Sequence, residues 1–213
     1  MKILVTGFDP FGGEKINPAI ESVKRLPEVI GGAQIVKLEI PTVVHQSLAV
    51  IREAIRKEDP DMILSIGQAG GRPDITVERV GINVDDCRIA DNAGNQPVDE
   101  PIYPERPDAY FVTLPIKAMV KAMQEAGIPA SVSNSAGTFV CNHVTYGVRY
   151  LIETEFPGKR SGFIHIPYLP SQASTKKGMP SMELDTIVKG LTVAIEAMIE
   201  HQEDVKITGG TIC

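Results

Sequence analysis

The alternation of hydrophobic and polar positions along the chain predicts short buried strands separated by amphipathic helices. Apolar runs with the length of core strands occur at residues 2–6, 34–40, 62–66, 130–133 and 162–166. Apolar residues recur at helical spacing in the segments 43–57, 116–123, 144–156 and 182–200. Because strands and helices alternate, we predict an α/β fold, a three-layer sandwich whose largely parallel central sheet is covered by helices on both faces.

Two stretches depart from this regular pattern. From residue 75 to residue 84 the apolar positions fall first at 75 and 77 and then at 80, 82 and 84, so the alternation slips by one at Glu78 and Arg79. We interpret the slip as a β-bulge, a feature that often re-aims a side chain near a site. Residues 85–108 are polar and proline-rich, which predicts a long irregular loop of the kind that is functional or disordered.

Length and composition are those of a chain with one substantial core. The chain has 213 residues, 43% of them hydrophobic, with no break in composition, and we predict a single domain over residues 1–213. The apolar run at residues 1–5 is shorter than the apolar region of a signal peptide, and no run approaches the about 18 residues of a membrane span. We therefore expect a soluble, cytoplasmic protein without a membrane partner.

The charged residues and the cysteines exclude several classes of partner and cofactor. A formal net charge of -6 leaves no basic stripe for a phosphate backbone, so nucleic acid is not an expected partner. The three cysteines, an odd number, lack the paired spacing of a disulfide framework or a zinc site. We expect reduced thiols, with Cys213 a free thiol at the end of the chain, and neither a metal nor a cofactor.

One cysteine stands where a turn of small residues leads into a predicted helix. The segment 133–143 reads Ser-Asn-Ser-Ala-Gly-Thr-Phe-Val-Cys-Asn-His, and Thr138 offers a hydroxyl of the type that caps helices. Cys141 then lies in the first helical turn, where unpaired N–H groups and the helix dipole stabilise a thiolate. We expect the pKa of Cys141 to fall below its reference value of about 8.5; the alternative is a small buried hydrophobe.

A cysteine nucleophile needs a base, and the chain has four histidines. His143 lies two residues after Cys141, which on a helix is about 200° of rotation, so the two side chains point to opposite faces. His45 and His201 lie in segments expected to be solvated. His165 interrupts an apolar strand near its carboxyl end, the edge at which open α/β sheets bind ligands. It is the candidate base, and an isolated core histidine is the alternative.

A third residue must orient the imidazole, and a carboxylate suits this role. Glu78 is the candidate because it lies at the slip in the alternation, close after a glycine-rich loop at residues 67–71 that is also expected at the active edge. The carboxylates that compete with it are Asp74, Asp85, Asp86 and Asp91. The alternative for Glu78 is a surface ion pair with a neighbouring arginine, the commoner fate of a Glu-Arg dipeptide.

Several segments spread over nearly the whole chain form an ordered set of motifs. They are residues 5–13 with Asn17 and Pro18, then 67–72, 78–80, 86–92, 133–143 and 162–170. Together they resemble the pyroglutamyl peptidase I family, which are cysteine peptidases. The resemblance implies an enzyme that hydrolyses the N-terminal pyroglutamyl residue from peptides through a thioester, in the cytoplasm and as a homotetramer. It also implies that Cys141 is the nucleophile, His165 the general base and Glu78 the acidic member of a triad.

The same resemblance implies the residues of a substrate pocket. Phe8 and Phe11 resemble aromatic walls for the pyroglutamyl ring; the alternative for both is a hydrophobic plug at the sheet edge. Gln68 resembles a hydrogen-bonding partner of the lactam, and Arg88 an arginine that polarises the scissile carbonyl. The remaining implied pocket residues are Asn17 at the entrance and the lining residues Thr42, Ile89, Phe139 and Val140. A neutral lactam suits such a pocket because it needs flat apolar walls and a few hydrogen bonds.

Two other functions stay open at this point. The glycine-rich segments 67–71 and 11–13 are compatible with a nucleotide-binding or phosphorylase-like module, although neither has GxGxxG or Walker spacing. Cys87 stands next to Arg88, and the family typically carries alanine at position 87. This leaves a non-catalytic thiol sensor or a degenerate peptidase as a second alternative. The other departures from the family pattern are Gly81, Ala90 and Ser171.

Overall fold

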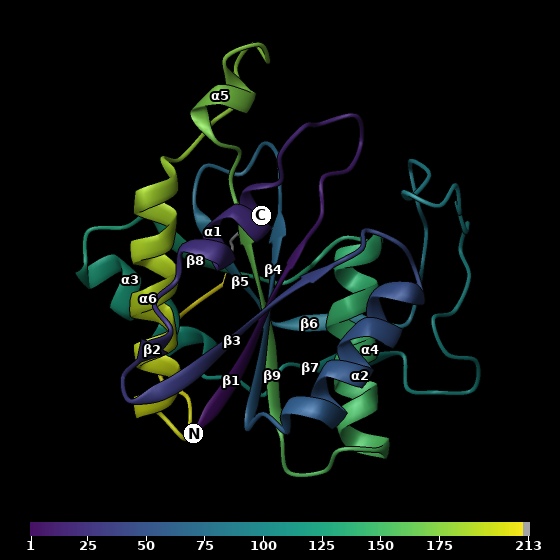
Figure 1. The fold of residues 1–213 in the computed structure, drawn as a ribbon, viewed down its shortest axis with the longest axis horizontal. Helices are drawn as coiled ribbons and strands as arrows, with labels where there is room; N and C mark the ends of the chain where they lie inside the picture. The colour runs from purple at the N-terminus through teal and green to yellow at the C-terminus, as the bar shows by residue number, and fades with distance from the viewer. Residues whose placement is uncertain (211–213) are drawn as a thin grey trace.

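A seven-stranded β-sheet forms the middle of the molecule, in a computed structural model that describes residues 1–210 (Figure 1). Its strands are β1 (Lys2–Phe8), β2 (Val29–Ile30), β3 (Ala33–Ile40), β4 (Met62–Gln68), β5 (Ile75–Glu78), β8 (Ala130–Ser133) and β9 (Arg160–Ile166). They lie side by side in the order β2-β3-β1-β4-β9-β5-β8. The helices are α1 (Pro18–Arg25), α2 (Gln46–Glu58), α3 (Ile116–Glu125), α4 (Val140–Thr154), α5 (Pro170–Ala173) and α6 (Leu184–Glu200).

Most neighbouring strands of this sheet run parallel. β1 pairs in parallel with β3 and with β4, and β4 pairs in parallel with β9. The short β2 runs antiparallel to β3. β5 runs antiparallel to β9, and β8 runs parallel to β5, so the last two strands reverse direction together. The predicted α/β sandwich with a largely parallel sheet is confirmed.

Helices pack on both faces of the sheet, and Figure 1 shows α1, α3 and α6 on the left and α2 and α4 on the right. The core on the first side includes Ile20 of α1, Met119 of α3 and Leu191 of α6. The core on the second side includes Leu48 of α2 and Val144 of α4. Each helix buries one apolar stripe, which is why its spacing was visible in the sequence. No helix among residues 1–210 has both the length and the apolar composition that crossing a membrane requires.

The stretch from residue 75 to residue 84 is not one bulged strand, so that prediction is wrong. β5 ends at Glu78, and one residue later the chain starts β6 (Val80–Ile82), which pairs antiparallel with β7 (Ala109–Phe111) in a separate two-stranded sheet. This hairpin lies against α4, since a Cβ atom at Gly81 would be 2.6 Å from the backbone nitrogen of Tyr146. The alternation slips because the chain changes sheets, and each sheet sets its own inward face.

The segment 85–108 contains no helix or strand apart from a single β-bridge, as predicted, and hydrogen bonds hold it in place. The backbones of Asp85 and Glu100 exchange hydrogen bonds of 2.7 and 3.0 Å. The carboxylate of Asp91 accepts hydrogen bonds from the backbone N–H groups of Val44, Ala93 and Asn95. The loop is therefore tied to the segment before α2 and is an ordered part of the fold.

The two short helices α1 and α5 were not predicted. α1 has a usual start signal, because Oδ1 of Asn17 accepts a 3.0 Å hydrogen bond from the N–H of Ala19 and Pro18 is the first helical residue. α5 has four residues, too few for a periodic pattern. Short helices of this kind are stabilised by what they pack against, and that information is not local in the sequence.

Candidate active site

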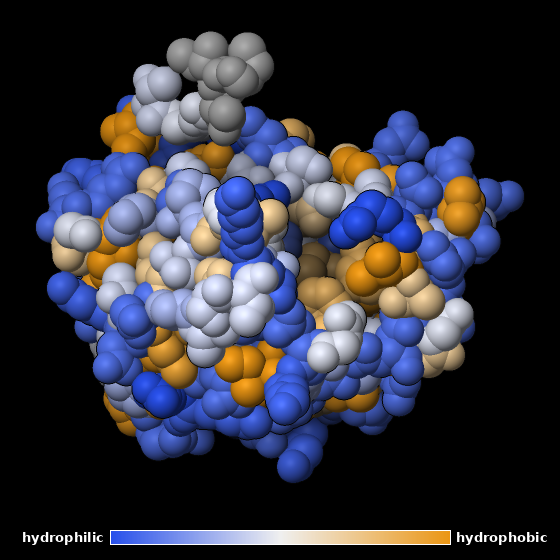
Figure 2. All heavy atoms as spheres, turned by 90° about the horizontal axis from the view of Figure 1, so that it is seen from above, coloured by the Kyte–Doolittle hydropathy of each residue, from blue (hydrophilic) through white to orange (hydrophobic). Residues whose placement is uncertain are grey.

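The carboxyl ends of β1, β4 and β9 meet at one edge of the sheet, which lies at the top of Figure 1. Figure 2 shows the molecule from above this edge, where the surface is hollowed, with apolar residues in and beside the hollow and polar residues around it. β4 ends here at Gln68 and β9 at Ile166. Ligands of open α/β sheets bind at this edge, so it is the place to look for a site.

Cys141 is the second residue of α4, and no side chain caps the start of this helix. The expected cap is wrong, because the Thr138 hydroxyl donates to the carbonyl oxygen of Asp86 at 2.8 Å. The first N–H groups of an α-helix have no acceptor within the helix. Those of α4 are therefore suited to hold a negative charge that develops beside the thiol.

The thiol of Cys141 lies against the backbone of β4 at Gly67. A Cβ atom at Gly67 would be 2.9 Å from Sγ of Cys141 and 2.7 Å from the ring of Phe163. In the parallel ladder Gly67 is paired with His165 of β9, and paired residues direct their side chains to the same face of a sheet. The thiol and the imidazole are therefore on the same face, over adjacent strands.

The imidazole of His165 is hydrogen-bonded to a buried carboxylate. Nδ1 of His165 lies 2.7 Å from Oε1 of Glu78, although 87 positions separate the two residues in the sequence. Glu78 is fully buried and His165 is 4% exposed. Oε1 of Glu78 also accepts a 2.6 Å hydrogen bond from the guanidinium of Arg72. The adjacent arginine, Arg79, donates to Oδ1 of Asn134 instead, so the alternative of an ion pair within the Glu-Arg dipeptide is wrong.

Burial and neighbouring charges set the protonation states of these groups. Burial, with a smaller contribution from the charge of Arg72, lowers the pKa of His165 by more than Glu78 raises it, so the neutral ring predominates at pH 7. Burial acts to raise the pKa of Glu78, but the hydrogen bond and charge of His165, with Ser133 and Arg72, hold it below its ordinary value. Burial, with the charge of Glu78, raises the pKa of Cys141 to about 12.

The expectation of a lowered thiol pKa is therefore wrong. Cys141 as a residue keeps partial exposure, but its thiol is enclosed between α4 and the sheet. Enclosure and a nearby carboxylate both disfavour the thiolate, and together they outweigh the charge of Arg72, which favours it. In the resting site the thiol is neutral, and the neutral imidazole over the adjacent strand is hydrogen-bonded to a carboxylate.

His143 of α4 belongs to a second buried pair of a histidine and a carboxylate. Its Nδ1 lies 2.7 Å from Oδ2 of Asp85, and its Nε2 accepts a 2.9 Å hydrogen bond from the backbone N–H of His45. The side chain of His143 has no exposed surface. Both ring nitrogens are therefore occupied, so His143 is not free to take a proton from Cys141, and Asp85 is engaged away from His165.

Comparison with known proteins gives this arrangement a family. Residues 1–201 match the family model described as pyroglutamyl peptidase. The chain belongs to the pyroglutamyl peptidase family. The pyrrolidone-carboxylate peptidase of Finegoldia magna is 63% identical over 210 residues, covering 99% of this chain and 99% of that protein. The pyrrolidone-carboxylate peptidase of Treponema denticola is 61% identical over 217 residues, covering 100% of each.

Solved structures of the pyroglutamyl peptidase family share the fold. Pyroglutamyl peptidase I of Bacillus amyloliquefaciens has a TM-score of 0.95 and 51% identity, covering 97% of this chain and 99% of that one. A variant pyrrolidone carboxyl peptidase of Pyrococcus furiosus has a TM-score of 0.90 and 44% identity, covering 94% of this chain and 99% of that one. The family and the class of enzyme predicted from the sequence are confirmed.

Two of the aromatic residues implied for the pocket lie together. The ring centroids of Phe11 and Phe139 are 6.2 Å apart, and Phe139 immediately precedes α4. Both residues are partly exposed, as the walls of an open pocket are. Phe8 is 2% exposed and packs with Phe163 in the core on the α2 and α4 side, and Val140 is fully buried there too. These last two support the site from within the core.

Asn17 and Thr42 are both buried and both hydrogen-bonded to Asp9. Nδ2 of Asn17 donates to the carbonyl oxygen of Asp9 at 2.9 Å. The N–H of Thr42 donates to Oδ1 of Asp9 at 2.7 Å, and its hydroxyl donates to the carbonyl oxygen of Asp9 at 3.2 Å. These two residues therefore shape the loop that follows β1.

The amide of Gln68 has a defined orientation at the end of β4. Its Oε1 accepts a 2.9 Å hydrogen bond from Nε2 of Gln172 in α5. Oε1 of Gln172 is itself engaged, because it accepts a 3.0 Å hydrogen bond from the N–H of Leu169. Nε2 of Gln68 makes no hydrogen bond with residues 1–210, so it is free to donate to a ligand oxygen.

The arginine that contacts Glu78 is Arg72, which was not among the predicted site residues. Arg88 and Ile89 are exposed on the 85–108 loop, and no side-chain hydrogen bond within residues 1–210 involves Arg88. The charge of Arg72, in contrast, works to lower the pKa of Cys141 and contacts Glu78 directly. Arg72 ends the motif 67–72, and the signal for it was a cation in the short loop that joins β4 to β5.

The second thiol is inaccessible in this structure. Cys87 is 3% exposed, and burial together with three aspartates raises its pKa to about 11. A thiol sensor at Cys87 is therefore not favoured, and Cys213 lies outside the described residues. No group of three or more His, Cys, Asp and Glu side chains within the described part of the chain is arranged to hold a metal ion.

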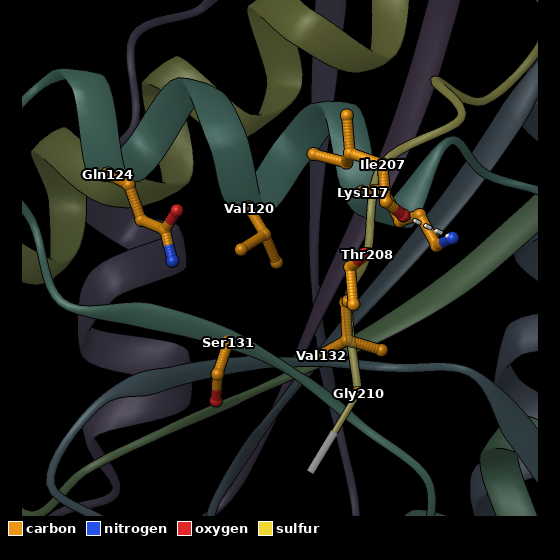
Figure 3. A pocket seen from close by; sticks show the side chains of 9 residues that line it. Lys117, Val120, Gln124, Ser131, Val132, Ile207, Thr208 and Gly210 are labelled. Carbon is orange, nitrogen blue, oxygen red and sulfur yellow. Dashed lines mark hydrogen bonds between the residues drawn. The ribbon is translucent and has the colours of Figure 1, made fainter. Parts of the chain in front are cut away.

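A cavity of about 220 Å³ lies between α3, β8 and the end of the described chain (Figure 3). Val120 and Gln124 line it from α3, and Ser131 lines it from β8. Nζ of Lys117 donates to the carbonyl oxygen of Ile207 at 2.6 Å and so ties the terminal segment to α3. No residue predicted for the active site lines this cavity.

Proposed function

We propose that this protein is a cysteine peptidase that removes N-terminal pyroglutamyl residues from peptides through a thioester acyl-enzyme. The observation that supports this most strongly is the 2.7 Å contact between His165 and Glu78, beside the backbone position that the Cys141 thiol touches. Nucleophile, base and orienting carboxylate are the parts that acyl transfer by a thiol requires. Membership of the pyroglutamyl peptidase family supports the choice of substrate.

The proposed reaction begins from a neutral thiol and a neutral imidazole. The Nδ1–H of His165 donates to Glu78, which leaves Nε2 as the proton acceptor. As Sγ of Cys141 attacks the pyroglutamyl carbonyl, Nε2 takes the thiol proton and then gives it to the leaving amine. Nε2 next takes a proton from water, which attacks the thioester, and the thiol is regenerated. Glu78 stabilises the imidazolium that forms in each half-reaction.

The negative charge on the carbonyl oxygen needs donors near the thiol. The unpaired N–H groups in the first turn of α4 supply donors that are fixed by the helix itself. Arg88 is the second proposed donor, because the family resemblance implies it and it has no competing side-chain partner within residues 1–210. An exposed side chain on the 85–108 loop has the freedom to move to a bound peptide.

The proposed specificity follows from the neutrality of the lactam. Phe11 and Phe139 supply apolar walls, and Nε2 of Gln68 donates to the lactam carbonyl oxygen. Pyroglutamate has no free α-amine, so the pocket needs no carboxylate for an ammonium group. A prolyl residue has no lactam carbonyl, so it would cover Nε2 of Gln68 without pairing it and would be rejected for that reason.

The test is turnover of a pyroglutamyl chromogenic substrate against its prolyl analogue, with and without iodoacetamide. We expect Cys141→Ala and Cys141→Ser to lower kcat/KM by at least about 10⁴-fold, as loss of a covalent nucleophile does. Cys87→Ala is the matched control, since Cys87 is a buried thiol outside the triad, and its kcat/KM should stay near wild type. Near-native turnover by Cys141→Ala, or equal turnover of the prolyl substrate by the wild type, would overturn the proposal.

The homotetramer and the cytoplasmic location are proposed on the family resemblance. Light scattering after size exclusion measures the assembly directly, and a mass of one or two chains would contradict the tetramer. Fractionation of the source cells tests the location.

A further inference from the structure

Arg72 joins three elements of the candidate site. One guanidinium nitrogen donates to Oε1 of Glu78 and to the hydroxyl of Thr76, each at 2.6 Å. The other donates to the carbonyl oxygen of Ser135 at 3.0 Å. Ser135 lies in the turn that leads to Cys141. The planar guanidinium of Arg72 therefore connects the carboxylate of Glu78 with the turn that precedes Cys141.

The loop that carries Arg72 is itself tightly held. The backbone N–H of Arg72 donates to the carbonyl oxygen of Ala69 at 3.2 Å and closes a turn between β4 and β5. A Cβ atom at Gly70 would be 2.2 Å from the ring of Tyr168, so the loop packs directly on that ring. The side chain of Arg72 is 31% exposed and lines an open groove with residues 131–135. Its side chain thus reaches inward from a fixed turn.

The positive charge of Arg72 also affects the protonation of Glu78 and His165. Glu78 is buried, and its Oε2 has no hydrogen-bond partner within residues 1–210. The charged or titratable groups that act on Glu78 are His165 and Arg72, and those that act on His165 are Glu78 and Arg72. Arg72 is the permanent cation of the set, so it offsets the charge of Glu78 while the imidazole is neutral. Without it, the buried carboxylate would raise the pKa of His165 unopposed by a neighbouring cation, and the ring would hold a proton more readily.

We propose that Arg72 is a positioning residue of the catalytic set: it fixes the Glu78 carboxylate and the turn before Cys141, and its charge opposes the protonation of His165 that Glu78 favours. This inference rests on the proposed function for its kinetic consequences. The part of the inference that concerns the protonation state of His165 can be measured without any substrate.

The experiment compares Arg72→Met with Arg79→Met in the full-length protein. Arg79 is a matched control, because its side chain donates to Asn134 in the same turn but forms no ion pair with Glu78 within residues 1–210. We expect Arg72→Met to lower kcat by about 10- to 100-fold with KM near wild type, since Arg72 is not one of the proposed substrate-pocket residues. The apparent pKa of the acid limb in the pH profile of kcat/KM should rise by about one unit, because a cation near a histidine is lost. Arg79→Met should alter neither quantity.

A titration that needs no turnover separates this inference from the proposed function. Protein labelled with ¹⁵N-histidine is titrated by NMR, and the His165 signal is assigned with His165→Gln. We expect the pKa of His165 to rise in Arg72→Met and to stay unchanged in Arg79→Met. If the wild type fails to cleave pyroglutamyl substrates, the proposed function is overturned, while this titration still decides the role of Arg72.

Arg72→Lys provides the second variant. It keeps the cation but has no fork to bridge Glu78 and Ser135, so we expect a wild-type acid limb with kcat still reduced several-fold. Where circular dichroism shows that Arg72→Met does not fold, Arg72→Lys alone decides: a reduced kcat supports the inference and a wild-type kcat overturns it. An unchanged His165 pKa in folded Arg72→Met, or an equal loss in Arg79→Met, also overturns it.

Discussion

A side chain at Gly67 and the thiol of Cys141 would compete for the same space, because a Cβ atom at Gly67 would lie 2.9 Å from Sγ. Real Cβ atoms do not approach sulfur this closely, so the thiol would have to move. The backbone of β4 at Gly67 is thus one wall of the space that the thiol occupies. The missing side chain lets the thiol sit over the strand next to that of His165.

We therefore predict that Gly67→Ala impairs catalysis more than folding. Displacing the nucleophile by about 1 Å costs on the order of 10²-fold in kcat/KM, and overpacking destabilises the fold by about 1–3 kcal/mol. The matched control is Gly190→Ala in α6, whose Cβ would lie 2.7 Å from Ile75 in the core on the other side of the sheet. It should lose stability to a similar degree but keep its kcat/KM. Equal kinetic losses in both variants would contradict this account.

The raised pKa of Cys141 predicts how the free enzyme reacts with iodoacetamide. The thiolate is the reactive form, and its fraction grows with pH until the pH passes the pKa, which burial and Glu78 raise to about 12. The alkylation rate should therefore keep climbing from pH 7 to about pH 10. Time courses analysed by peptide mass spectrometry give the rate for each thiol separately. A rate at Cys141 that is already level below pH 7 would indicate an ion-paired thiolate and contradict the prediction.

The fold could be predicted where burial alone shapes the pattern. The apolar residues of β4 are buried along the whole strand, and those of α6 recur once per helical turn on the side that faces the core. Local periodicity is therefore enough to predict both elements. The break after Glu78 was misread because a chain that changes sheets leaves the same mark as a bulge. α5 was missed because it is held by contacts such as those of Gln172, which join positions far apart in the sequence.

The site was predictable in its residue types and not in its energetics. Cys141, His165 and Glu78 carry side chains that the chemistry requires at positions that the element order brings near one edge, and their roles stay predictions for the substitutions above. The thiol pKa was predicted in the wrong direction because a helix start is a local feature, whereas enclosure depends on β4 and β9. Arg72 was overlooked because its contacts depend on the path of a loop.

His143 and His165 should respond differently to the same substitution. His143→Leu leaves the buried Asp85 without its partner and the N–H of His45 without an acceptor, so we expect a loss of about 3–5 kcal/mol in the free energy of unfolding. At a temperature where the variant is folded, its kcat should remain close to wild type. His165→Leu should instead abolish turnover. Urea unfolding and kinetics at one protein concentration measure both effects, and a kcat that collapses in folded His143→Leu would show that His143 takes part in the chemistry.

The hydrogen bond from Gln172 to Gln68 should set the preference for a lactam over a proline ring. Gln172→Leu removes the donor that fixes Oε1 of Gln68, so its amide is free to rotate and no longer presents Nε2 in one direction. One such hydrogen bond contributes about 1 kcal/mol or slightly more, which corresponds to a loss of roughly tenfold in the ratio of kcat/KM for pyroglutamyl and prolyl substrates. Lys176→Met is the control, because it breaks the 2.7 Å ion pair with Glu14 near α5 without touching Gln68. A ratio that stays at the wild-type value in Gln172→Leu, or falls equally in Lys176→Met, would mean that the orientation of Gln68 does not select the substrate.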